Sequence, residues 1–207
     1  MKINITVIVI FILLLAFGCA ETESNVQTSQ SQVSKTEDVS EPQLYTAYNI
    51  WRVRAYLMRC INYKYGNEIL PAGTMVKDVK VVKKEKDYHS KRRYYISFTT
   101  VDDNHVYKID FTSNWHPGKT AEDYKNLMIT TKTLEELTEG MTDQEIQAIK
   151  HGTVLNGMSK SAVLVAYGYP PEHRTGSIYS STWIYWSNKF NTFRVCFDDN
   201  DRTVPCW

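Results

Sequence analysis

The chain has 207 residues, of which 43% are hydrophobic and 13% aromatic, so it can bury a core in one or two domains. This composition excludes a protein that is disordered throughout. Removing residues 1–18, which contain one lysine and no acid, leaves 23 basic and 23 acidic residues. The balanced charge excludes the general positive field of a nucleic-acid-binding protein, and we expect no nucleic-acid partner.

The N-terminus has the pattern of a secretory signal. Lys2 precedes an almost entirely apolar run over residues 3–17, which is too short to span a bilayer comfortably. The dipeptide Gly18-Cys19 after this run resembles the lipobox of bacterial lipoproteins. The resemblance implies that residues 1–18 are removed and that Cys19 becomes the lipidated N-terminus; an ordinary cleaved signal is the alternative. Because Ala20 is not aspartate, the resemblance also implies the periplasmic face of the outer membrane.

The segment 19–44 is predicted to be a disordered tether. It is dominated by Ser, Thr, Gln, Glu, Asn and Asp, which cannot bury enough apolar surface to offset the entropy cost of ordering. A random coil of this length has an end-to-end distance of roughly 30 Å. The folded part is therefore expected to stay near the membrane.

Residues 45–131 are predicted to form a small β-rich domain. Strand pieces are expected within Tyr45–Tyr65, and a turn at residues 70–74 leads into a strand over residues 75–82. The alternating segments 94–101 and 106–111 predict a hairpin joined at Asp102-Asp103-Asn104. Such short strands favour a bent sheet or a partly open barrel that is SH3-like in outline. Thr120 is expected to cap a short helix from Ala121 to about Met128.

Residues 132–207 contain the same helix-starting signal twice. Gly140-Met141-Thr142 and Gly157-Met158-Ser159 each place a hydroxyl residue where it can cap a helix, and Glu145 completes a capping box with Thr142. The predicted helices cover residues 143–151 and 160–167 and end at glycines, where positive φ angles are expected. The second helix is apolar almost all round, so it should be buried.

Three short strands are predicted after Tyr169-Pro170-Pro171, over residues 182–187, 192–198 and 202–207. They follow one another closely enough to form an antiparallel meander. The predicted fold class is therefore α+β, with a C-terminal two-helix, three-stranded domain.

The C-terminal succession resembles the BamE (SmpA/OmlA) family of small outer-membrane lipoproteins over residues 141–207. The residues that carry the resemblance are Gly157-Met158-Ser159-Lys160, Val163, Gly168-Tyr169-Pro170, Trp183, Tyr185 and Val195-Cys196-Phe197-Asp198. The resemblance implies a non-enzymatic periplasmic scaffold that supports envelope assembly, without a cofactor and with an envelope protein as partner. A peptidoglycan- or glycan-binding module, in which aromatic residues of Tyr45–Tyr65 stack on sugars, is an alternative. A cell-wall hydrolase is a further one.

Two groups of residues are candidate contacts. Basic residues are in excess between Lys77 and Arg93, and contacts to anionic lipid are expected at Lys83, Lys84, Arg92 and Arg93, unless this segment is only a solvated tip. The strand Trp183-Ile184-Tyr185-Trp186 has large rings on both faces. One face must pack on the N-terminal β-domain or meet a partner, so Trp183, Tyr185 and Trp186 are a candidate partner face.

The five histidines are expected at the surface, because they lie in or next to turns and none has a second metal-type residue at ligand spacing. No metal site or catalytic residue is therefore predicted.

The cysteines beyond Cys19 allow at most one bridge. In the strand over residues 192–197, Cys196 points away from the apolar face, whereas Val204 and Cys206 are expected to face inward. Because the two cysteines are expected on opposite faces of the sheet, a bridge between Cys196 and Cys206 is not favoured. This placement favours Cys60 with Cys206, and unbridged buried thiols are the alternative.

Overall fold

The computed structural model describes residues 41–52, 58–64, 68–84 and 94–207. The chain divides into Met1–Val39 and a single compact unit, Ser40–Trp207. The predicted signal over residues 1–18, Cys19 and nearly all of the predicted tether lie outside the described residues, as do Arg92 and Arg93. Among the described helices, none has the length and apolar character needed to cross a membrane.

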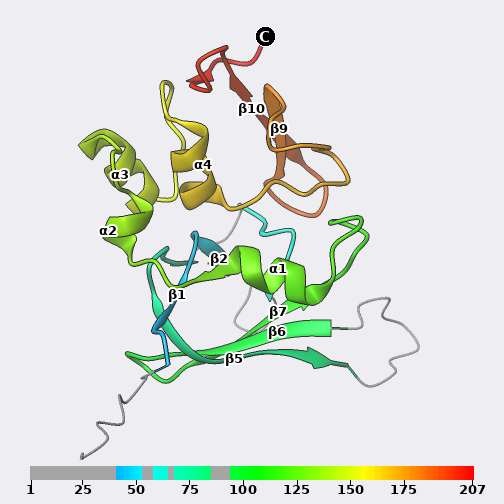
Figure 1. Cartoon of the computed structure of the whole chain (residues 1–207). Helices are drawn as coiled ribbons and strands as arrows, with labels where there is room; N and C mark the ends of the chain where they lie inside the picture. Colours follow the sequence, from blue (N-terminus) through cyan, green and yellow to red (C-terminus); the bar gives the residue numbers. More distant parts are fainter. Residues whose placement is uncertain (1–40, 53–57, 65–67, 85–93) are drawn as a thin grey trace, which may run out of the picture. The chain divides into compact units, whose positions relative to one another are not determined.

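The described residues form a mixed α+β fold with a curled six-stranded sheet (Figure 1). The strand order is β3-β7-β6-β5-β1-β8, and all neighbours are antiparallel except β3 and β7. The strands are β1 (Leu44–Thr46), β3 (Met58–Arg59), β5 (Met75–Lys83), β6 (Tyr94–Thr100), β7 (Val106–Phe111) and β8 (Ile129–Thr130). The predicted β6–β7 hairpin is confirmed. Since β3 and β8 are edges, the described strands make an open curled sheet and not a closed barrel.

Helix α1 (Ala121–Met128) lies over one face of this sheet (Figure 1). Its predicted start is confirmed, because the Thr120 side chain accepts a hydrogen bond from Asp123 N in a full capping box. The helix buries Tyr124 and Met128 against a core that includes Ile96 and Phe98, both fully buried. The opposite face of the sheet has no helix over it in Figure 1.

The C-terminal part contains three helices and a three-stranded meander. The elements are α2 (Leu134–Leu137), α3 (Asp143–Lys150), α4 (Lys160–Tyr167), β9 (Thr182–Trp186), β10 (Thr192–Phe197) and β11 (Thr203–Val204). The strand order β11-β10-β9 confirms the predicted meander. Both repeated caps are confirmed at Thr142 and Ser159, and α4 is buried as expected. Helix α2 was not predicted, although its Thr133-x-x-Glu136 capping box is visible in the sequence.

Glu145 connects the two repeated helix starts. Its Oε2 accepts from Thr142 N at 3.0 Å within the capping box of α3. Its Oε1 accepts from Ser159 N at 2.8 Å, at the start of α4, and from Arg202 Nη1 at 3.1 Å. Burial acts to raise the pKa of Glu145, but the hydrogen bonds from Ser159 and Thr142 outweigh it and lower the pKa. One carboxylate therefore stabilises both helix N-termini.

Two buried asparagines join the β-rich part to the C-terminal helices. Asn49 Nδ2 donates to Ile149 O at 2.6 Å, and Asn49 Oδ1 accepts from Ala72 N at 2.8 Å. Asn62 Nδ2 donates to Asn49 O at 3.0 Å and to Tyr167 O at 3.2 Å. The predicted division between residues 131 and 132 is consequently not a division between compact units.

The remaining small sheet also lies at this junction. It pairs β2 (Ile50–Arg52) with β4 (Glu68–Leu70). Gly168, which ends α4 with a φ of 75°, is packed so closely that a Cβ there would lie 2.7 Å from the Tyr48 ring. Both its positive φ and this contact require glycine.

The disulfide joins Cys196 to Cys206, with Cα atoms 5.4 Å apart, so the preferred Cys60–Cys206 pairing is wrong. The error was in the face assigned to the last strand. Cys196 lies opposite Val204 in the β10–β11 ladder, which puts Val204 on the outer side with Cys196. The inward position belongs to Thr203, whose buried Oγ1 donates to Leu155 O at 2.6 Å.

Candidate functional site

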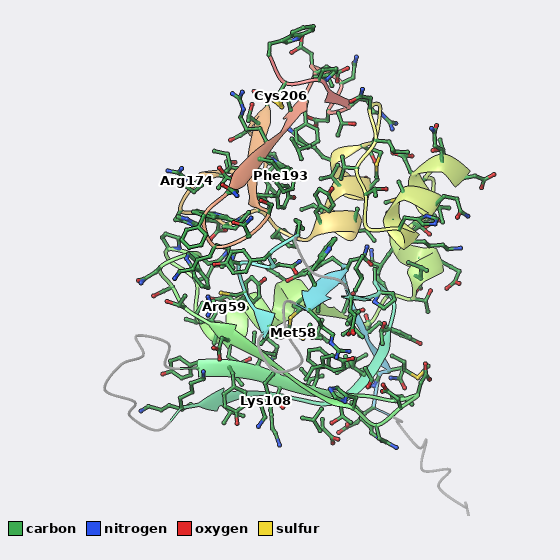
Figure 2. All side chains as sticks on the ribbon, turned by 180° about the vertical axis from the view of Figure 1, so that it is seen from behind. Met58, Arg59, Lys108, Arg174, Phe193 and Cys206 are labelled. Atoms are coloured by element: carbon green, nitrogen blue, oxygen red, sulfur yellow. A yellow bond between two sulfur atoms is a disulfide. The ribbon has the colours of Figure 1, made fainter. Side chains whose placement is uncertain are left out.

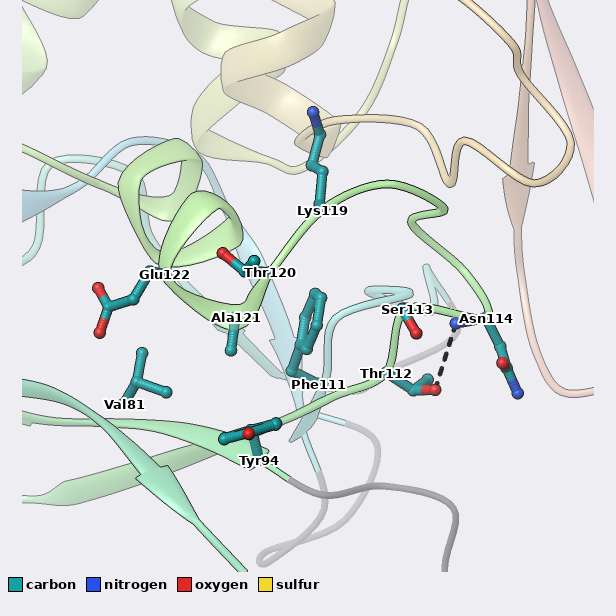
Figure 3. Close-up of a pocket in the computed structure, with 10 residues that line it drawn as sticks. All are labelled: Val81, Tyr94, Phe111, Thr112, Ser113, Asn114, Lys119, Thr120, Ala121 and Glu122. Atoms are coloured by element: carbon teal, nitrogen blue, oxygen red, sulfur yellow. Dashed lines mark hydrogen bonds between the residues drawn. The ribbon is translucent and has the colours of Figure 1, made fainter.

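A cleft of about 580 Å³ lies between the start of α1 and strands β5, β6 and β7 (Figure 3). Its described lining residues are Val81, Tyr94, Phe111, Thr112, Ser113, Asn114, Lys119, Thr120, Ala121 and Glu122. The cleft is positioned by the β6–β7 hairpin and by the Thr120 cap, both of which the sequence predicts. The cleft itself could not be predicted, because its walls come from three segments that are distant in sequence.

The cleft has an apolar floor and a polar rim. Val81, Tyr94, Phe111 and Ala121 form the floor in Figure 3, and Tyr94 is 37% exposed. Exposed Ser113, Asn114 and Glu122 are on the rim. Such a site can bind an amphiphilic ligand through ring contacts and hydrogen bonds.

Lys119, Glu122 and the hydroxyls of Thr112 and Thr120 already have structural partners. Lys119 points away from the cleft floor in Figure 3, and its Nζ lies 3.1 Å from Glu172 Oε1. Glu122 pairs with Lys125 at 2.5 Å. Thr120 Oγ1 accepts from Asp123 N, and Thr112 Oγ1 accepts from Asn114 N. These two hydroxyls stabilise backbone turns.

A buried polar cluster connects α1 to the N-terminal segment. Tyr48 Oη donates to Tyr124 Oη at 3.0 Å, and Tyr124 Oη donates to Cys60 O at 2.6 Å. His116 Nε2 lies 3.3 Å from the same carbonyl oxygen. Burial raises the pKa of Tyr124 well above its usual value, so the phenol remains a hydrogen-bond donor at neutral pH.

His116 is fully buried, which corrects the expectation that all five histidines lie at the surface. Its Nδ1 is 3.9 Å from Glu172 Oε2 and makes no hydrogen bond to any described residue. Burial lowers the pKa of His116 from 6.5 to about 4, and the Cys60 carbonyl and Glu172 oppose this effect only in part. Sequence reasoning missed the residue because Trp115-His116-Pro117-Gly118 has the composition of a surface turn.

We expect His116 to destabilise the fold in mild acid. The unfolded chain binds a proton at His116 near pH 6.5, whereas the folded chain does so only near pH 4, so the free energy of unfolding should fall as pH drops through this interval. His116 should account for about 2 kcal/mol of the loss between about pH 7.5 and pH 5. Urea titrations of wild type and His116→Gln at both pH values measure this difference.

The comparison of the two proteins removes contributions from Glu145 and the other groups that titrate in this interval. Glu172, His173, Lys119 and Tyr124 face or contact His116 and remain in the variant. An equal loss of stability in wild type and His116→Gln would show that His116 is not the buried neutral group.

The predicted anionic-surface residues are only partly described. Lys83 is exposed near the end of β5. Lys84 is partly buried and forms an ion pair with Asp110, so its charge is already compensated. Of the two described residues, only Lys83 therefore has an exposed side chain without an ion pair to another described residue.

The predicted partner face does not form at Trp183 and Tyr185. Both are buried, at 0% and 1% exposure, because they point from β9 toward α4 and the inner residues of β10. Trp186 lies on the other face, partly buried and stacked on His173 with ring centroids 6.0 Å apart. The chain covers this second face itself, since Ile184 N donates to Thr175 Oγ1 at 2.9 Å.

Lys64 occupies an aromatic box formed by Trp51, Tyr167 and Tyr185. Its Nζ lies 4.3 Å from the ring centroid of Trp51, 5.5 Å from that of Tyr167 and 5.3 Å from that of Tyr185. Nζ also donates to Asn62 O at 2.7 Å. Burial lowers the pKa of Lys64 well below its usual value, while the ring faces and the carbonyl favour the charged amine. Through these contacts Lys64 links β2, α4 and β9.

Comparisons with protein-family models, with curated proteins and with solved structures gave no match. Within residues 41–207, excluding the undescribed gaps, no group of three or more His, Cys, Asp or Glu side chains is placed to hold a metal ion.

Proposed function

We propose that the protein is an exported lipoprotein of a bacterial envelope, anchored through Cys19 at the periplasmic face of the outer membrane. The observation that carries this proposal is the Cys196–Cys206 disulfide in a chain that begins with an apolar signal ending in Gly18-Cys19. Disulfides of this kind persist in oxidising compartments and are rare in the cytoplasm. The signal and the disulfide therefore each support export from the cytoplasm.

We further propose that residues 41–207 act as a non-enzymatic interaction module for an envelope protein. Support comes from the resemblance of residues 141–207 to BamE-like domains; in this region α3 and α4 precede the meander β9–β11. The exposed aromatic residues of the C-terminal part offer contacts. Tyr179 is 86% exposed before β9, and Phe190 is 82% exposed in the β9–β10 turn.

The anchor is tested by expressing the tagged full-length chain and its Cys19→Ala variant in a bacterium with two membranes. Mass spectrometry of the wild-type N-terminal peptide should find cleavage before Cys19 and acylation of its thiol and amine. The variant should lose this species and leave the outer-membrane fraction. A wild-type protein that is unacylated, cytoplasmic and reduced at Cys196 and Cys206 contradicts the proposal.

The partner is tested with a photo-crosslinking side chain at Tyr179 or Phe190, with exposed Lys150 as the control position. The same envelope protein should be captured from the first two positions and not from the third.

A glycan-binding module is the second candidate, favoured by the half-exposed Tyr94 ring beside the polar rim of the cleft. Sedimentation with purified peptidoglycan sacculi, with Tyr94→Ala as the variant, distinguishes it from binding of a protein.

A further inference from the structure

The face of the six-stranded sheet opposite α1 carries a set of basic side chains that the strand register brings together. Lys80 on β5 lies opposite Ser97 on β6, which lies opposite Lys108 on β7. Lys77 lies opposite Thr99, closer to the β6–β7 turn. Because side chains alternate along a strand, these residues share the face that is turned away from buried Ile96 and Phe98. We call Lys77, Lys80 and Lys108 the lysine face.

The lysine face carries exposed charges, although Lys77 Nζ donates to the neutral Asn104 Oδ1 at 2.7 Å. All three lysines are exposed, and within the described part of the chain none forms an ion pair. Lys108 lies on the lower side of the sheet in Figure 2, away from the helices, and its Nζ is 5.4 Å from the Tyr95 ring centroid. Ser97 between Lys80 and Lys108 is itself buried, at 5% exposure, so the two exposed lysines form the surface of this row.

Other charges near the lysine face do not cancel it at its centre. Asp110, one row beyond Lys108, is already paired with Lys84 and lies opposite Arg59 in the β3–β7 ladder. Among the described residues, the other acids near these strands are Asp78, in the β5 bulge between Lys77 and Lys80, and Asp102 and Asp103 in the β6–β7 turn. The positive field is therefore centred on the Lys80–Ser97–Lys108 row.

The path of the chain brings this face next to the segment that leads to the proposed anchor. That segment enters the fold at β1, where Leu44 pairs with Val76 and Gln43 Nε2 donates to Val76 O at 3.3 Å. Lys77 is the next residue of β5. The residues between Cys19 and Leu44 can span up to roughly 80 Å, so an anchor at Cys19 leaves the lysine face free to reach the bilayer surface.

We propose that the lysine face docks on an anionic lipid bilayer. Three exposed lysines spread over one face of the sheet, beside the entry of the tether, suit an extended membrane surface better than a pocket for one soluble anion. The location rests on the proposed membrane anchor, but binding by the face itself does not. Each lysine near an anionic surface contributes about fivefold in affinity, so all three contribute on the order of a hundredfold.

The experiment uses the chain from residue 19 onward with Cys19→Ser, which cannot carry acyl chains, so its outcome is independent of the anchor. Co-sedimentation is measured with vesicles of equal parts phosphatidylglycerol and phosphatidylcholine, and with pure phosphatidylcholine. We expect binding only to the first, lost in 0.5 M NaCl, and weakened on the order of a hundredfold by Lys77→Gln/Lys80→Gln/Lys108→Gln. The matched control, Lys132→Gln/Lys150→Gln/Lys189→Gln, removes three exposed lysines elsewhere and should change binding less than about twofold.

Three outcomes would overturn the proposal. The lysine-face variant could bind as tightly as the parent while both give the same circular dichroism spectrum. The control variant could lose as much affinity as the lysine-face variant, which would indicate an unspecific charge effect. Binding to a short DNA duplex as tight as that to the anionic vesicles, at the same salt concentration, would reject a membrane as the occupant.

Discussion

Replacing Asn49 with leucine should lower the free energy of unfolding by about 4 kcal/mol. The variant keeps the approximate shape of the side chain but leaves Ile149 O and Ala72 N without the bonds that Asn49 supplies. A buried polar group without a partner costs about 1–3 kcal/mol, and here two are created at once. Urea denaturation followed by tryptophan fluorescence measures the loss.

Two further variants identify the cause. Asn49→Asp keeps an acceptor for Ala72 N but cannot donate to Ile149 O, so it should also destabilise. Asn126→Leu makes the same chemical change at an exposed position of α1 and should alter stability by less than about 0.5 kcal/mol. If Asn49→Leu stays within about 1 kcal/mol of wild type, the two parts of the chain are not held together by this residue.

Removing the disulfide should lower the free energy of unfolding by about 3 kcal/mol, because the closed loop reduces the conformational entropy of the unfolded chain. The double variant Cys196→Ala/Cys206→Ala and the reduced wild type should both show the loss, and reductant should not affect the double variant. Chemical denaturation with and without reductant measures these differences.

Thiol alkylation checks the pairing directly. In the chain with Cys19→Ser, denatured without reductant, only Cys60 should be labelled, and all three cysteines should be labelled after reduction. A mapped Cys60–Cys206 peptide, or labelling of Cys196 before reduction, would contradict the structure.

Local features of the fold were predictable because their cause lies within a few residues. The starts of α1, α3 and α4 follow from Thr120, Thr142 and Ser159, each bonded to an amide three residues away. The β6–β7 hairpin follows in the same way from alternation and a polar turn. The sequence could not reveal that the Glu145 carboxylate also reaches Ser159 N, because that bond depends on how α3 packs on α4.

The features that were missed depend on contacts between distant segments. Val204 has the apolar character of an inward residue, yet the bonds of Thr203 decide the face, because its Oγ1 donates to Leu155 O and accepts from Met158 N. His116 lies in a segment with the composition of a surface turn, but it is buried against Tyr124 of α1. The aromatic box around Lys64 likewise brings together residues of β2, α4 and β9. The cleft and the lysine face likewise require the strand register, which alternation within single strands does not provide.

The bonds made by Asn49 and Lys64 also constrain the order in which the protein can mature. Asn49 bonds to Ile149, 100 residues later, and Lys64 N donates to Trp186 O. If the chain emerges from a translocation channel with its N-terminus first, Asn49 and Lys64 cannot form these bonds until Ile149 and Trp186 have emerged. The N-terminal segment therefore stays incompletely folded until β9 is outside the channel. During that time Trp51 and Tyr48 lack their covering residues, so the nascent protein depends on rapid completion or on a chaperone to avoid aggregation.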